Sequence, residues 1–190
     1  MPELKQELRV LDAFIEHFTP YIYDDELFGQ VDNRLPKLTV GGLLFRLHLL
    51  ESLHDHLSPD EQAQLHAARQ NFESLRYEWL GHYKDKLLQE MRSRIHSIEW
   101  YLEDCGTNPA GCDGGWPNEA EKRTILEHLR LEAIALDALP RELKSDLSQL
   151  DTHLRRYYRT SQFIWDESLQ AAYPQEQFWW LYGRPKPHDS

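Results

Sequence analysis

The sequence lacks long hydrophobic runs and an apolar leader. Its longest weakly polar stretch, residues 38–45, is about eight residues long, whereas a membrane-spanning helix needs roughly 20. Residues 1–7 are charged from the start and do not show the order of basic, apolar and small residues that a secretory signal has. We therefore expect a soluble, cytoplasmic protein with no membrane partner.

Positive charge is scarce. The chain has 21 Lys and Arg against 32 Asp and Glu, a net charge of −11. A field of this sign repels phosphate backbones, so we expect no nucleic-acid partner. Residues 155–159 interleave arginines with tyrosines, a combination that can grip single strands. We interpret these arginines instead as cations that complement the dipole at the end of a helix.

The common catalytic signatures are also missing. The sequence contains no Gly-x-Ser-x-Gly, Gly-x(4)-Gly-Lys or Gly-x-Gly-x-x-Gly. An Arg-x(4–6)-His spacing, found in some small helical ribonucleases, occurs from Arg76 to His82 and from Arg123 to His128. Composition alone predicts about two such pairs by chance. These observations favour a protein that is not an enzyme, but they do not decide whether it has catalytic activity.

There are two cysteines, Cys105 and Cys112, with six residues between them. A zinc knuckle has two to four residues between paired ligands and needs a second pair, which is missing here. A disulfide is sterically allowed and would stabilise the fold by roughly 2–3 kcal/mol. A reducing cytoplasm favours free thiols, so both states remain open.

Apolar residues recur at helical spacing through most of the chain. The first stripe predicts a helix over about 2–18, which Thr19-Pro20 ends, and residues 21–40 lose the period and predict an irregular N-terminal loop. Thr39 is the predicted N-cap of a second helix, about 40–57, with His54 on its core side. Ser58 and Glu61 then form a capping-box pattern. From there the apolar positions keep a mean spacing near 3.7 residues, which predicts one unbroken central helix over about 59–104.

The remainder predicts two further helices and an aromatic extension. Four glycines and a proline predict a loop over 105–116, and Pro117 opens a fourth helix that runs to about 139. A fifth follows Pro140 and buries a stripe from Leu143 to Tyr157. We predict an all-α fold, an antiparallel bundle of about five helices, in one domain over 1–184 with a frayed polar tail at 185–190.

Histidines and carboxylates on the second helix suggest a metal site. Glu51 and His54 have the Glu-x-x-His spacing of carboxylate-bundle metalloproteins, which require that pair twice. The residues that would bind a divalent metal ion are His48, Glu51, His54, Asp55 and His82. The alternative without a metal is that His54 lies at the edge of the core and is hydrogen-bonded to Glu51 or to a backbone carbonyl.

The aromatic residues of the tail suggest an interface. Residues 177–182 contain four aromatic side chains and a leucine near the chain end, and exposed residues of this kind would aggregate. They must bury either against their own bundle or against a partner. As interface residues we predict Phe178, Trp179, Trp180 and Tyr182, with the acidic, aromatic segment containing Tyr21, Tyr23 and Phe28 as a counterpart.

The leading hypothesis is a non-catalytic helical interaction or assembly protein without a cofactor. It would bind a protein partner or self-associate through the aromatic C-terminal segment. The alternative is a helical bundle that binds a metal ion or a small ligand through the second helix.

Overall fold

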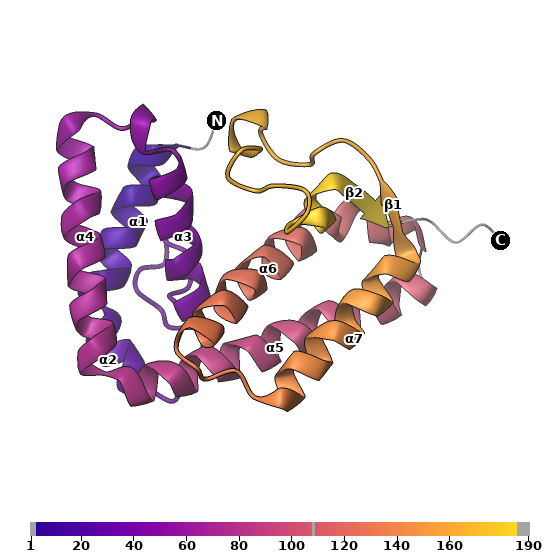
Figure 1. The fold of residues 1–190 in the computed structure, drawn as a ribbon, viewed down its shortest axis with the longest axis horizontal. Helices are drawn as coiled ribbons and strands as arrows, with labels where there is room; N and C mark the ends of the chain where they lie inside the picture. The colour runs from indigo at the N-terminus through magenta and orange to yellow at the C-terminus, as the bar shows by residue number, and fades with distance from the viewer. Residues whose placement is uncertain (1–2, 108, 186–190) are drawn as a thin grey trace. The chain divides into compact units, whose positions relative to one another are not determined.

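The computed structural model describes residues 3–107 and 109–185, and nearly all of its regular secondary structure is helical (Figure 1). The predicted all-α class is therefore confirmed. The chain forms two compact units, residues 1–90 and 91–190. The single domain over 1–184 stays a prediction. Of the predicted polar tail, Pro185 belongs to a short strand, and residues 186–190 lie outside the described residues.

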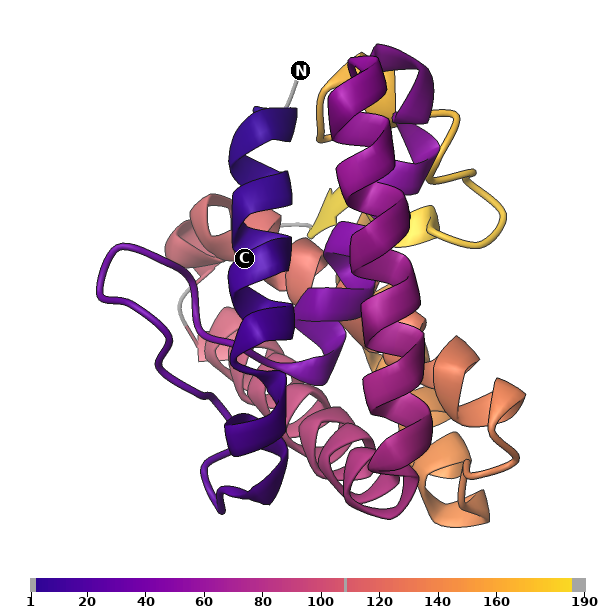
Figure 2. The same cartoon turned by 90° about the vertical axis from the view of Figure 1, so that its left-hand side faces the viewer.

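Three helices of the first unit pack around a shared core. Its elements are α1 (Leu4–Glu16), α2 (Phe18–Tyr23), α3 (Val40–Ser52), the 3-10 turn η1 (His54–His56), α4 (Pro59–Glu78) and the first turns of α5 (Leu80–Thr107). Helix α1 lies against both α3 and α4, and α3 runs antiparallel to them (Figures 1 and 2). Leu11, Leu43 and Leu50 are fully buried between these helices. The antiparallel bundle of about five helices stays a prediction.

The helix starts follow the capping chemistry that the sequence predicts. Thr39 Oγ1 accepts a hydrogen bond from Gly42 N at 2.9 Å, and Ser58 with Glu61 forms a complete capping box. The start of α3 has no acidic residue in its first turn. Instead Glu90, 49 positions later and fully buried, accepts a hydrogen bond from Gly41 N at 2.8 Å. A carboxylate at this end of the helix also complements its dipole.

The end of the first helix differs from the prediction. Thr19-Pro20 does not end the helical structure, because the chain bends at His17 and resumes as α2. Pro20 lies in the first turn of α2. Backbone N–H groups in a first turn have no intrahelical acceptor, so a proline, which lacks the N–H, is tolerated there. Residues 24–39 are irregular as predicted, apart from an isolated bridge between Gly29 and Leu38. The second helix ends at Ser52, and His54 lies in η1 with an exposed side chain rather than on the core side.

The prediction of one unbroken helix over 59–104 is wrong at Trp79. This residue has ψ of 28°, outside the helical range, and it separates α4 from α5 (Figure 1). The bend brings Tyr83 back to Phe72, with ring centroids 6.0 Å apart, although in a straight helix residues eleven apart lie about 16 Å apart along the axis. Phe18 contacts both rings. All three side chains are buried, so aromatic packing accompanies the break.

The second unit combines helices with an ordered C-terminal segment. After the later turns of α5, its elements are α6 (Pro109–Ala135), α7 (Arg141–Tyr157), β1 (Tyr158–Thr160), the 3-10 turns η2 (Glu167–Leu169) and η3 (Trp179–Tyr182), and β2 (Gly183–Pro185). Strands β1 and β2 pair antiparallel, with Thr160 opposite Gly183. A Cβ at Gly183 would lie 2.4 Å from the carbonyl oxygen of Arg159, so only glycine fits this close approach.

The predicted loop over 105–116 is mostly helical. Helix α5 continues to Thr107, and α6 begins at Pro109 and includes Pro117 in its interior. Cys105 and Cys112 are joined by a disulfide, and Trp116 is fully buried. These tertiary constraints offset the cost of about 1 kcal/mol that each glycine adds to a helix. None of the helices in the described part of the chain has the length and apolarity that a bilayer span requires.

Candidate functional site

The aromatic C-terminal segment packs on its own unit. Phe178, Trp180 and Tyr182 are 2, 1 and 7% exposed. Trp180 Nε1 donates to Thr124 Oγ1 of α6 at 2.9 Å, and Tyr182 Oη donates to the carbonyl oxygen of Tyr173 at 2.7 Å. Three of the predicted interface residues are thus core residues. They bury against their own bundle, which was the alternative to burial against a partner. Trp179 alone among the four is half-exposed.

A buried ion network joins this segment to α6 and α7. Arg123 is 3% exposed and pairs at two points with Asp151, with Nε to Oδ1 at 2.8 Å and Nη2 to Oδ2 at 2.9 Å. Its Nη1 lies 3.4 Å from Glu127 Oε2. Arg130 donates twice to Glu127, at 2.6 and 2.9 Å, and Gln177 donates to it at 3.4 Å. Charged donors and acceptors in this network therefore satisfy one another.

Glu127 keeps its charge within this network. Burial acts to raise the pKa of Glu127, but hydrogen bonds from Arg130 and the charge of Arg123 outweigh it and lower the pKa below its usual range. The Glu127 carboxylate in turn raises the pKa of Arg130. The lowered pKa and the hydrogen bonds to both carboxylate oxygens make Glu127 a weak base. The network can fix the positions of α6, α7 and the C-terminal segment relative to one another.

The side chains of this network line a groove of about 540 Å³. The groove is lined by four cationic and three acidic side chains, of which Arg123, Arg130, Glu127 and Asp151 belong to the network. The other charged residues of the lining are Lys144 and Arg155 of α7 and Glu176. Among the described residues, neither Lys144 nor Arg155 has a carboxylate partner.

The rim of the groove combines a cation with an indole. The guanidinium carbon of Arg155 lies 3.8 Å from the ring centroid of Trp179, within the range of a cation–π contact. Trp179 itself remains half-exposed. Arg155 is held by stacking and still has its donors available. This arrangement can bind an anionic group beside an apolar surface.

The predicted metal ligands do not form a site. Glu51 pairs with Arg69 at 2.7 Å, and His54 Nδ1 lies 3.5 Å from Asp55 of the same exposed turn. His82 instead contacts the ring of Tyr23, at a centroid distance of 5.1 Å. In the ranges 3–107 and 109–185, no three His, Cys, Asp or Glu side chains gather as a metal ion would need. His48 lies on α3, half-exposed.

The predicted counterpart segment divides between core and surface. Tyr21 is 5% exposed, and its hydroxyl donates to the carbonyl oxygen of Leu27 at 3.0 Å. Tyr23 and Phe28 are 53 and 40% exposed. Tyr23 lies on Trp79 at a centroid distance of 4.7 Å. This segment therefore presents aromatic surface from a fixed backbone.

The disulfide between Cys105 and Cys112 joins the end of α5 to the start of α6. Tyr101 packs beside it and donates to the carbonyl oxygen of Cys112. Burial, with the charges of Glu119 and Asp113, raises the pKa of Tyr101 well above its usual value. This tyrosine therefore stays a neutral donor. The pair is a structural link between two helices.

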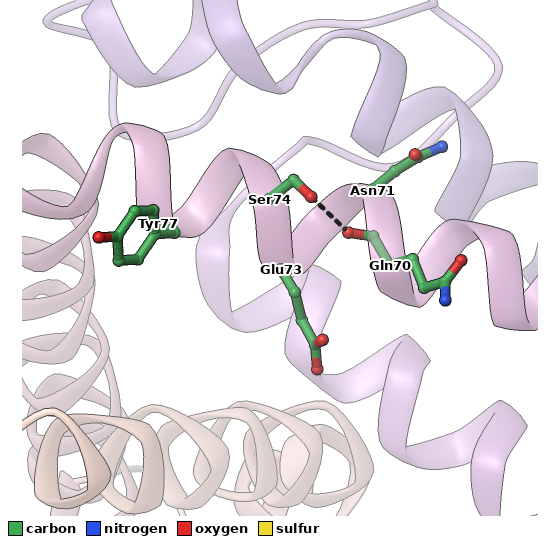
Figure 3. A pocket seen from close by; sticks show the side chains of 5 residues that line it. All are labelled: Gln70, Asn71, Glu73, Ser74 and Tyr77. Carbon is green, nitrogen blue, oxygen red and sulfur yellow. Dashed lines mark hydrogen bonds between the residues drawn. The ribbon is translucent and has the colours of Figure 1, made fainter.

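A second hollow, of about 650 Å³, lies along α4. Figure 3 shows that its lining side chains, from Gln70 to Tyr77, project from this one helix. Ser74 Oγ donates to the carbonyl oxygen of Gln70 at 3.1 Å. Tyr77 is 83% exposed. A face built by one helix does not converge polar groups on a ligand, so we place the functional site in the groove.

Of the residues that line the groove, Trp179 and Trp180 were predicted as interface residues, whereas the charged residues were not predicted as a site. Arg123, Glu127 and Arg130 have the i, i+4 and i, i+3 spacings of helical ion pairs, which was the available signal. Asp151 comes from another helix, and no pattern in the sequence links it to Arg123. Comparison of the chain with models of known protein families, with curated proteins and with solved structures finds no match.

Proposed function

We propose that the chain is a non-catalytic helical interaction protein whose second unit binds an acidic segment of a protein partner in the groove. The observation that carries the proposal is the pair of cations, Lys144 and Arg155, which have no carboxylate partner among the described residues and line the groove beside a network whose charges are satisfied. A carboxylate of a ligand bound in the groove would form ion pairs with Lys144 and Arg155.

The rim favours a protein ligand. Trp and Arg are enriched among residues that anchor protein interfaces, and here Arg155 is stacked on a half-exposed Trp179. The groove is open and largely polar, unlike the apolar pockets that enclose small molecules. A net charge of −11 also repels nucleic acid at a distance. An acidic peptide is the ligand that these properties fit best.

Tryptophan fluorescence can test the proposal, because Trp179 borders the groove. We expect a glutamate-rich peptide to change the emission of the full chain and to lose about tenfold or more in affinity with Arg155→Glu. The matched control is Arg156→Glu, the next residue of α7, which is also exposed and lines a different hollow. Equal binding by both variants would contradict the proposal.

A single-stranded oligonucleotide serves as the competing probe. If it displaces the peptide from the wild type, or binds when the peptide does not, the groove is a nucleic-acid site and the protein-partner proposal is wrong. If it fails to compete, the peptide result stands.

A further inference from the structure

The first unit carries a surface that complements the groove. Asp24, Asp25 and Glu26 are exposed in succession, between the exposed aromatic rings of Tyr23 and Phe28. We call residues 23–28 the acidic loop. It combines three carboxylates with two aromatic side chains, whereas the groove combines the cations Lys144 and Arg155 with the indole of Trp179.

The acidic loop is held in a defined conformation. Lys86 Nζ donates to the carbonyl oxygen of Glu26 at 2.6 Å, so this cation binds the backbone of the loop. Asp24 Oδ1 accepts a hydrogen bond from Glu26 N at 3.1 Å. Packing of Tyr23 on Trp79 fixes the start of the loop. A preformed segment loses little conformational entropy when it binds.

The carboxylates of the loop remain available. Among the described residues, Asp24, Asp25 and Glu26 take part in no side-chain ion pair. Their charges act on Lys86, whose own pKa is lowered chiefly by burial. Further cations brought close to these carboxylates would be attracted to them.

We propose that the acidic loop of one copy of this chain docks into the groove of a second copy. Lys144 and Arg155 would pair with the loop carboxylates, and Trp179 would contact the ring of Tyr23 or Phe28. This inference rests on the proposed function of the groove and names its occupant. Every copy carries one loop and one groove, and each contact pairs the loop of one copy with the groove of another.

The net charge limits when this contact forms. Each copy carries −11, so two copies repel one another at long range. At about 0.15 M salt the Debye length is near 8 Å, which screens that repulsion more than it weakens ion pairs in direct contact. The association is therefore tested at physiological ionic strength.

The test uses two complementary variants of the full chain, measured by light scattering and sedimentation. The loop variant carries Asp24→Asn, Asp25→Asn and Glu26→Gln, and the groove variant carries Lys144→Gln and Arg155→Gln, so that no new pair of opposite charges is created between them. We expect the wild type to gain mass with concentration and each variant alone to remain a monomer. Mixed in equal amounts, they should form a heterodimer and nothing larger, because the mixture retains one intact loop and one intact groove per pair.

Arg156→Glu is the control for a change of charge on α7, and it should associate like the wild type. A wild type that remains monomeric up to its solubility limit overturns the proposal. So does a mixture of the two variants that fails to pair. If the glutamate-rich peptide still binds the wild type in either case, the proposed function stands and only self-docking is wrong.

Discussion

Arg123 of α6 and Asp151 of α7 form a two-point ion pair beneath the aromatic C-terminal segment. The guanidinium carbon of Arg123 also lies 4.0 Å from the ring centroid of Trp180. One buried cation therefore links two helices and the tail.

Loss of this cation should destabilise the second unit. Arg123→Met leaves Asp151 without its partner and removes one of two cations from the buried Glu127, so we expect a loss of about 3 kcal/mol. Urea unfolding followed by circular dichroism measures it. The control is Arg69→Ala, which breaks partly exposed pairs with Glu51 and Glu73 and should cost less than about 1 kcal/mol. Equal losses would show that the buried network adds nothing.

Acid should weaken the same network. The folded state lowers the pKa of Glu127, so its carboxylate stabilises the fold fully above the unfolded pKa, near 4.5, and loses this contribution as the pH falls through the lowered value. Glu127→Gln removes the titrating group. The difference in unfolding midpoint between wild type and Glu127→Gln should therefore be largest near neutral pH and shrink below about pH 4.5. A difference that stays constant with pH would refute this assignment.

The tail should behave as part of the core. Trp180→Ala removes a side chain that is 1% exposed and its hydrogen bond to Thr124, and we expect a loss of about 3–5 kcal/mol. Trp100→Ala, at a tryptophan that is 66% exposed, should change stability by no more than about 0.5 kcal/mol. Thermal unfolding followed by near-ultraviolet circular dichroism compares the two. Similar midpoints for both variants would mean that the tail does not contribute to the core.

The disulfide should stabilise the junction of α5 and α6. Replacement of Cys105 and Cys112 by serine should cost roughly 2–3 kcal/mol, because the unfolded chain regains the freedom of that loop. Reductant should lower the unfolding midpoint of the wild type to that of the double variant and leave the variant unchanged. A wild type insensitive to reductant, with the thiols shown to be free, would mean that the link contributes no stability.

Local signals in the sequence predicted much of the fold. Thr39, Ser58 and Glu61 mark helix starts because capping depends on residues three positions apart. The apolar stripe of α7 predicted its burial, and the structure buries Leu143, Leu147, Leu150 and Leu154. In each case the residues that form the signal lie within a single helix or its cap.

The errors arose where tertiary contacts decide the local structure. At Trp79 the helical period continues through the break, so the stripe cannot reveal that Tyr83 turns back to Phe72. Across 109–117 the glycines and Pro117 oppose a helix, and burial of Trp116 with the disulfide outweighs them.

The groove could be predicted only in part. Arg123, Glu127 and Arg130 share one face of α6, and that much follows from spacing. Their pairing with Asp151, and the stacking of Arg155 on Trp179, depend on how α7 and the tail pack. Those contacts join residues 24 or more positions apart, beyond the reach of any periodic pattern.

The hydrogen bond from Gly41 N to Glu90 has a consequence for the order in which the chain folds. At the start of α3, Gly42 N bonds to the nearby N-cap Thr39, whereas Gly41 N bonds to a residue made 49 positions later. On a ribosome this hydrogen bond could not form until Glu90 had left the exit tunnel. The hydrogen bonding at the start of α3 is therefore completed only after this part of α5 has been made.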